Sequence, residues 1–150
     1  MQEPLAALKA IRKNELVLPA GSSIDNQPLT LSGAGQDQLE YIFKIVTTGK
    51  SSITLGRGAN ELFRFGITDL EAAGERLVEY GHQNSTIFAP EKFVTLHLFI
   101  DVSVLEIFID YQLCITADFH GDPSGGFWLA IESSPGSVPI KKLQGWELSL

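Results

Sequence analysis

Two runs of alternating apolar and polar residues, separated by a short break, constrain the fold of this chain more than any other feature. The first run covers 93–101, and its aliphatic positions are Val94, Leu96, Leu98 and Ile100. The second covers 104–111, and its apolar positions are Leu105, Ile107, Ile109 and Tyr111. Alternation with a period of two is typical of a β-strand with one buried face, and two such runs around a short loop predict a β-hairpin.

The register of this hairpin can be predicted from its side chains. A tight loop at 102–103, or a longer one at 101–104, aligns the aliphatic residues in pairs: Ile100 with Leu105, Leu98 with Ile107, and Leu96 with Ile109. A slip of one residue would turn these side chains to the opposite face. We therefore expect the aliphatic face in a core. Any function of the hairpin is expected on the other face, which carries His97, Phe99, Asp101, Glu106, Phe108 and Asp110.

Short strand-like runs continue along the rest of the chain. They cover 16–18, 29–31, 39–47, 51–56, 62–68, 76–80, 113–119, 126–131 and 138–150. Turn residues recur between such runs at intervals of about eight to twelve positions, and no long helical pattern is present. The sequence therefore predicts an all-β fold, a two-sheet antiparallel β-sandwich of the concanavalin or lectin-like jelly-roll type.

The connections between the runs predict the domain organisation. We expect 113–119 and 126–131 to pair with each other around the loop 120–124, and 69–75 to form a short polar or helical excursion. Residues 1–13 are interpreted as a lead-in segment, helical or extended, and 14–150 as a single domain. A length of 150 residues suits one domain with a substantial core.

Composition argues against several classes of partner. Eleven basic and eighteen acidic residues give a formal charge of −7, with no basic run, so neither nucleic acid nor an anionic membrane is expected to bind. The single Cys114 excludes an intrachain disulfide and a cysteine-rich metal site. No apolar run approaches about 20 residues, and the first residues, MQEPLAALKA, lack a signal-like segment. These features favour the cytoplasm without fixing the compartment.

Residues 96–109 carry a more specific signal. They read LHLFIDVSVLEIFI, in which Asp101, Ser103, Glu106 and Phe108 form the pattern D-x-S-x-x-E-x-F between two hydrophobic strands. This stretch resembles the C-terminal β-sandwich domain of glycoside hydrolase family 32, the invertase, fructanase and sucrose-6-phosphate hydrolase family. Residues 4–12 resemble that family's segment between catalytic propeller and sandwich, and LQGWEL at 143–148 resembles its closing strand.

The chain departs from the family's pattern at two places. The turn after the second strand often carries glycine in the family, whereas this chain has Asp110-Tyr111-Gln112. The family often shows an Asp-Arg pair in the middle of the domain, where the aligned residues here are Leu77-Val78-Glu79-Tyr80.

The resemblance implies a non-catalytic accessory domain. The family's catalytic carboxylates lie in a five-bladed propeller, in Asn-Asp-Pro, Arg-Asp-Pro and Glu-Cys motifs, and none of these motifs occurs in this sequence. The chain is then expected to stabilise a propeller that hydrolyses sucrose or fructans and to provide an interaction surface. The resemblance also implies no cofactor and no enzyme activity of the chain on its own. The expected interface, with the propeller or with a second copy in a homodimer, contains His97, Phe99 and Phe108.

Two other functions are compatible with the residues. A carbohydrate-binding, lectin-like module would stack sugars on exposed rings, for which the candidates are Trp128, Phe127 and Tyr111. Neighbours in a strand point to opposite faces, so one of Phe127 and Trp128 must face outward, although both could be partly buried. Trp146 is expected to be a core anchor. The other alternative is a small glycosidase.

The glycosidase hypothesis rests on two carboxylates. Asp101 and Glu106 would be diagonal neighbours across the hairpin, about 5–7 Å apart, near the separation that a retaining glycosidase requires. The simpler interpretation is that Asp101 begins the turn and accepts a hydrogen bond from Ser103, while Glu106 is a surface or interface carboxylate.

Metal binding and glycosylation are not expected. His97, His120 and Asp122 have no recognised ligand spacing, so the sequence predicts no metal site. Asn84-Ser85-Thr86 is a formal glycosylation sequon, which we expect to be unused because no signal segment accompanies it.

Overall fold

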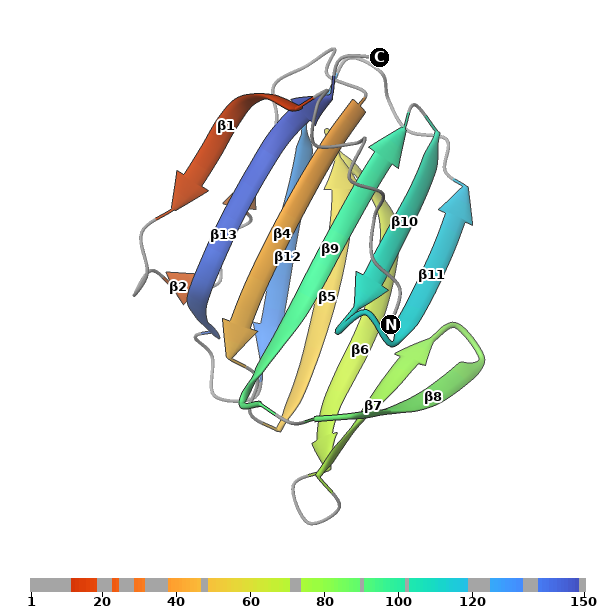
Figure 1. The fold of residues 1–150 in the computed structure, drawn as a ribbon. Helices are drawn as coiled ribbons and strands as arrows, with labels where there is room; N and C mark the ends of the chain where they lie inside the picture. The colour runs from red at the N-terminus through yellow and green to blue at the C-terminus, as the bar shows by residue number, and fades with distance from the viewer. Residues whose placement is uncertain are drawn as a thin grey trace.

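The chain forms two antiparallel sheets packed face to face in a computed structural model (Figure 1). The parts of the chain that the structure describes are residues 12–18, 23–24, 29–31, 38–46, 49–70, 74–89, 91–101, 103–118, 125–133 and 138–148. Within these parts every strand pairing is antiparallel. The predicted two-sheet antiparallel β-sandwich is therefore confirmed.

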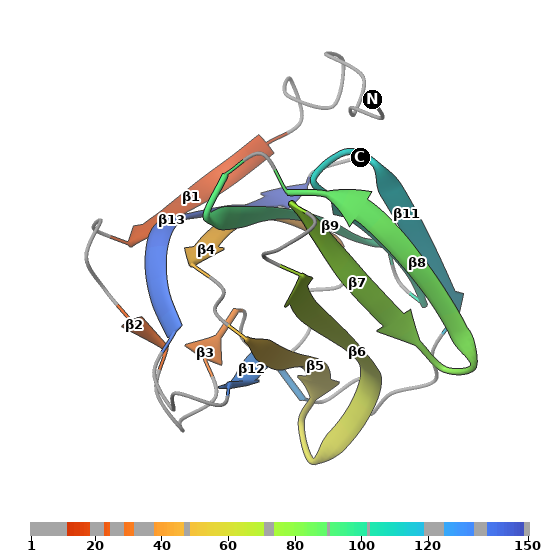
Figure 2. The same cartoon turned by 90° about the horizontal axis from the view of Figure 1, so that it is seen from below.

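The two sheets exchange strands along the chain. The first sheet has the order β1 (Arg12–Leu18), β13 (Val138–Leu148), β4 (Gln38–Val46), β9 (Phe93–Asp101), β10 (Val104–Ile109) and β11 (Leu113–Asp118), and β2 (Ser23–Ile24) also pairs with β13. The second has the order β3 (Leu29–Thr30), β12 (Phe127–Ser133), β5 (Lys50–Arg57), β6 (Asn60–Leu70), β7 (Glu75–Tyr80) and β8 (Gln83–Phe88). Figure 2 shows both layers end on, with β7 and β8 turning toward β11 along one side of the sandwich.

The hairpin register is confirmed residue by residue. Ile100 pairs with Leu105, Leu98 with Ile107, and Leu96 with Ile109. Asp101 pairs with Val104, so the ladder continues to the residues that flank 102–103, of which Val102 lies outside the described residues. All six aliphatic side chains are at most 1% exposed, which places this face of the hairpin in the core.

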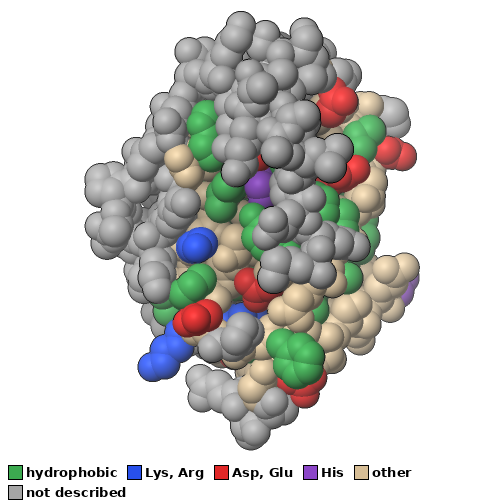
Figure 3. Space-filling view, viewed as in Figure 1, with side chains coloured by type: hydrophobic (Ala, Val, Ile, Leu, Met, Phe, Trp, Pro, Cys, Tyr) green, Lys and Arg blue, Asp and Glu red, His purple; other side chains and the backbone are tan. Residues whose placement is uncertain are grey.

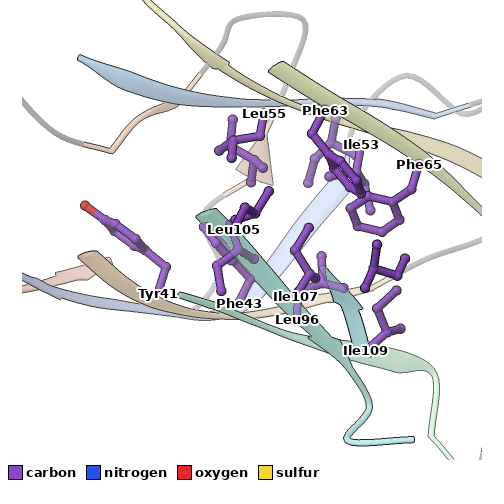
Figure 4. Packing of buried hydrophobic residues seen from close by; sticks show 14 of the residues in the cluster. Tyr41, Phe43, Ile53, Leu55, Phe63, Phe65, Leu96, Leu105, Ile107 and Ile109 are labelled. Carbon is purple, nitrogen blue, oxygen red and sulfur yellow. The ribbon is translucent and has the colours of Figure 1, made fainter. Parts of the chain in front are cut away.

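The core lies between the two sheets. The first sheet contributes alternate residues of β4, β9 and β10, and the second contributes alternate residues of β5 and β6, which face them across the sandwich (Figure 4). The labelled members are Tyr41, Phe43, Leu96, Leu105, Ile107 and Ile109 from the first sheet and Ile53, Leu55, Phe63 and Phe65 from the second. Burial of these large apolar side chains is the dominant favourable term in folding.

Several sequence predictions differ from the structure. The runs 113–119 and 126–131 were expected to pair, but β11 pairs with β10 in the first sheet and β12 pairs with β3 and β5 in the second. The prediction was wrong because sequence neighbours do not have to pair when the connection is long enough to cross between sheets. Strand β6 continues through Asp69 and Leu70, and β8 was not expected because QNSTIF has no clear alternation.

Other expectations fall outside the described residues. Residues 1–11 of the expected lead-in segment lie outside the described residues, whereas Arg12 and Lys13 begin β1. No segment in the described ranges forms a helix long and apolar enough to cross a membrane.

Candidate functional site

The outward side chains of β4, β9 and β10 bring the predicted interface residues together. Cross-strand pairing places Glu40, Phe99 and Glu106 in one row and Ile42, His97 and Phe108 in the next. These rows lie on the face that points away from the core, where hydrophobic, acidic and histidine side chains gather (Figure 3). We call Glu40, His97, Phe99, Phe108 and Tyr111 the outer-face cluster.

A buried polar chain forms the centre of this cluster. His97 Nε2 lies 2.6 Å from Glu40 Oε2, and His97 Nδ1 lies 2.8 Å from the Tyr111 hydroxyl. His97 is 3% exposed and Glu40 is fully buried. A carboxylate can only accept here, so His97 donates through Nε2, and in the neutral imidazole the Tyr111 hydroxyl donates to Nδ1. The bonds satisfy polar groups that would be costly to bury alone.

Aromatic rings cover this polar chain. Phe99 stacks on the His97 ring at 4.6 Å between centroids and an interplanar angle of 25°. Phe108 meets Phe99 edge-on at 6.1 Å and 89°. Both phenylalanines are half-buried, so each still has surface available to a partner.

The turn 110–112 places Tyr111 on an unexpected face. Alternation predicts Tyr111 on the aliphatic face, but Asp110 and Tyr111 have φ values of 49° and 54°, and Gln112 N–H donates to Ile109 O. Two successive residues with positive φ end the alternation of the strand and match the geometry of a type I′ turn. The Tyr111 ring consequently meets His97 edge-on on the outer face.

Asp110 connects the turn to the second sheet. Its Oδ1 accepts a hydrogen bond from Thr95 N–H, and its Oδ2 pairs with Arg76 Nη1 at 3.0 Å. Arg76 is 2% exposed and also pairs with Asp69 at 3.1 Å. Burial raises the pKa of the Asp110 carboxyl, although the Thr95 amide and the Arg76 charge act in the opposite direction.

The third turn residue, Gln112, holds the edge strand β8. Its side-chain oxygen accepts from Phe88 N–H at 2.9 Å, and its amide nitrogen donates to Phe88 O at 3.1 Å. One turn therefore joins the outer-face cluster, the buried arginine and the β7–β8 hairpin.

Sequence reasoning missed Glu40, Asp69 and Arg76. For Asp69 and Arg76 the signal was a charged residue at an inward position of an otherwise apolar alternation, whereas Glu40 occupies an outward position of β4, where a charged residue is ordinary.

The two carboxylates of the family motif lie on the surface. Asp101 and Glu106 are both exposed, and Asp101 Oδ1 accepts a hydrogen bond from Gln38 Nε2 rather than from Ser103, which is itself exposed. A glycosidase requires one carboxylic acid in a desolvated environment. Neither side chain occupies such an environment.

Phe127 and the two tryptophans lie in different places. Phe127 is fully buried in the core with the Arg57 guanidinium over its ring at 4.7 Å, so it offers no face to a sugar. Trp128 is half-buried on the outer face of the second sheet. Trp146 is 8% exposed, but it pairs with Glu40 and so lies on the outer face of the first sheet. Trp146 is therefore buried, as expected of an anchor, but it does not belong to the cluster between the two sheets.

The remaining sequence candidates concern metal binding, the single cysteine and the glycosylation sequon. No group of three or more His, Cys, Asp or Glu side chains that could hold a metal ion occurs within the described part of the chain, and His120 and Asp122 lie outside it. Cys114 is half-buried in β11, and burial raises the pKa of its thiol. Asn84 is exposed in β8.

Comparisons with known proteins agree with this fold. The family model described as "Glycosyl hydrolases family 32 C terminal" matches residues 20–147. No curated protein matches the sequence.

The fold of this chain is similar to parts of several solved structures. Fructan 1-exohydrolase IIa from Cichorium intybus has a TM-score of 0.76 and 12% identity over 99% of this chain and 38% of its own. Sucrose-6-phosphate hydrolase from Lactobacillus gasseri has a TM-score of 0.61 and 19% identity over 99% of this chain and 30% of its own. The β-fructofuranosidase from Bombyx mori has a TM-score of 0.56 and 16% identity over 97% and 29%. The chain thus spans about a third of the length of these enzymes.

Proposed function

Because this chain belongs to the family of C-terminal domains of family 32 glycosyl hydrolases, we propose that it is the accessory domain of a β-fructoside hydrolase. In this role it stabilises a catalytic five-bladed propeller and does not itself cleave sugars. The observation that carries the proposal is that the family match covers residues 20–147 while the chain spans only about a third of similar enzymes. The remaining two thirds of those enzymes is where a separate catalytic unit would lie.

The outer-face cluster is the surface that we assign to the catalytic domain. Phe99 and Phe108 are half-buried and lie beside the exposed carboxylates Glu106 and Asp101. Apolar rings at the centre and charged groups at the rim are typical of protein interfaces. The buried pairs of His97 with Glu40 and with Tyr111 would hold the surface in one shape before the partner arrives, which reduces the entropy lost on binding.

The test uses the 150-residue chain and a family 32 catalytic domain from the same organism, produced without its own C-terminal domain. We expect no fructose release from sucrose, sucrose 6-phosphate, inulin or levan by the chain alone. Adding the chain should raise the melting temperature of the catalytic domain, since a ligand that binds only the folded state stabilises it by mass action. The double variant Phe99→Ser with Phe108→Ser should remove this increase.

The matched control is Phe88→Ser, which removes a ring that is 72% exposed on the other sheet. It should leave the increase unchanged. Fructose release by the chain alone that disappears in Asp101→Asn or Glu106→Gln would instead establish the glycosidase alternative. Stabilisation that is the same with and without the two phenylalanines would assign the interface elsewhere.

A further inference from the structure

The outer face of the second sheet carries an indole ring that the core does not use. Trp128 on β12 pairs with Gly56 on β5, which pairs with Glu61 on β6, so the three residues form one row across the sheet. A bulge in β6 between Glu61 and Phe63 turns Glu61 to this face while Phe63 remains in the core. The row lies on the face opposite to the core, away from the outer-face cluster.

Gly56 allows the Trp128 ring to lie on the sheet. A Cβ atom at position 56 would be 2.0 Å from Trp128 Cζ2 and 2.1 Å from Cε2, so only glycine leaves room for the ring. The indole Nε1–H donates to Gly58 O at 2.8 Å, which fixes the orientation of the ring in its plane. One side of the ring therefore covers Gly56, and a half-buried, oriented aromatic surface is turned outward.

A charged pair lies on β6, the strand that pairs with β5 beneath this ring. Arg64 Nε donates to Glu61 Oε1 at 2.7 Å, and Arg64 Nη2 lies 2.6 Å from the same oxygen. The Arg64 and Glu61 side chains are 58% and 48% exposed. The pair carries no net charge, but it presents oriented N–H donors and carboxylate lone pairs to solvent.

We propose that Trp128, Glu61 and Arg64 form a binding subsite for a neutral oligosaccharide. The apolar C–H face of a sugar ring packs on the negative face of an indole, and its hydroxyl groups both donate and accept hydrogen bonds. A neutral ligand is favoured because the guanidinium is already neutralised by Glu61 and the chain carries a formal charge of −7. The ring is held by its hydrogen bond to Gly58 O before binding, so little of its side-chain entropy is lost. The subsite does not depend on the proposed role beside a catalytic domain.

The two tryptophans of the chain make the test direct. In ¹H–¹⁵N spectra of the isolated chain, each indole N–H gives one resonance, and Trp128→Phe identifies which belongs to Trp146. We expect titration with 1-kestose or with maltotriose to move the Trp128 resonance saturably, while the Trp146 resonance stays in place. Failure of both trisaccharides to give a saturable shift, or equal shifts of both indoles, would overturn the proposal.

Variants test the contributions of the ring and the ion pair to binding. Trp128→Phe should weaken binding and Gly56→Ala should abolish it, because the added methyl displaces the ring. Glu61→Gln combined with Arg64→Gln should weaken binding about tenfold while leaving the ring in place. Phe88→Ser removes an exposed ring elsewhere on the second sheet and should leave binding unchanged. Binding that survives both Gly56→Ala and the double variant, in proteins with unchanged circular dichroism, would contradict the proposed subsite.

Discussion

Asp110 and Tyr111 adopt the left-handed backbone conformation, with φ values of 49° and 54°, without being glycine. This region costs an L-residue about 1–2 kcal/mol, although Asp tolerates it better than most. The cost is offset by the contacts that the turn makes possible. Asp110 bonds Thr95 and Arg76, and Tyr111 bonds His97. A glycine, which the family often has in this turn, would relieve the strain but would make none of these side-chain contacts.

The raised pKa of Asp110 predicts a definite pH dependence of stability. Since its folded pKa lies above the ordinary value of 3.8, the folded state holds the proton more tightly than the unfolded state. The contribution of Asp110 to the free energy of unfolding is therefore largest below 3.8 and falls as pH rises through the folded pKa. Urea melts at a series of pH values should show wild type losing stability relative to Asp110→Asn across this window. Wild type gaining stability relative to the variant with rising pH would contradict the prediction.

At the scale of elements, the β9–β10 hairpin presents two faces with opposite requirements. Ile107 is 1% exposed and pairs with Leu98 inside the sandwich, whereas Glu106, its neighbour in sequence, is exposed. The alternation of a strand thus places a position that tolerates few substitutions next to one that tolerates many.

Substitutions at these two neighbours should differ sharply. Ile107→Asp should prevent folding, because it buries an unpaired charge in the core. Glu106→Ala should lower the free energy of unfolding by less than about 1 kcal/mol, as is usual for exposed sites. Circular dichroism and urea melts measure both. Equal tolerance of the two substitutions would mean that the assignment of the faces is wrong.

At the scale of the whole molecule, the two large outward surfaces have different characters. The outer face of the first sheet carries Phe99 and Phe108 over a buried polar chain. The outer face of the second carries Trp128 beside an exposed ion pair, and the 72%-exposed Phe88 stands at its edge. The exposed part of a half-buried ring is removed from water only when a partner covers it, and this burial favours association.

We expect the isolated chain to self-associate weakly through the outer-face cluster. Burial of further ring surface favours a homodimer, while the charge of −7 opposes close approach only weakly at physiological salt, where screening acts within about 8 Å. Sedimentation velocity over a concentration series should show a dimer that Phe99→Ser with Phe108→Ser removes. Phe88→Ser is the control. A monomer at every concentration, or a dimer lost only in Phe88→Ser, would refute the assignment.

The sequence by itself determined most of the strands, the sandwich class and the hairpin register. The reason is that these features depend on side chains close together along the chain. Alternation assigns each residue of a strand to a face, and the short loop at 102–103 leaves only one register that matches aliphatic residues in pairs. The family motif D-x-S-x-x-E-x-F is local in the same sense.

The tertiary structure alone decided which distant residues meet. Glu40 and His97 are 57 residues apart, and Arg76 and Asp110 are 34 apart, so no local pattern marks them as partners. The placement of β11 and β12 in different sheets has the same origin, because strand order is set by packing of the whole chain. Tyr111 lies on the outer face because two positive φ values end the alternation, and contacts to separate elements hold that turn in place.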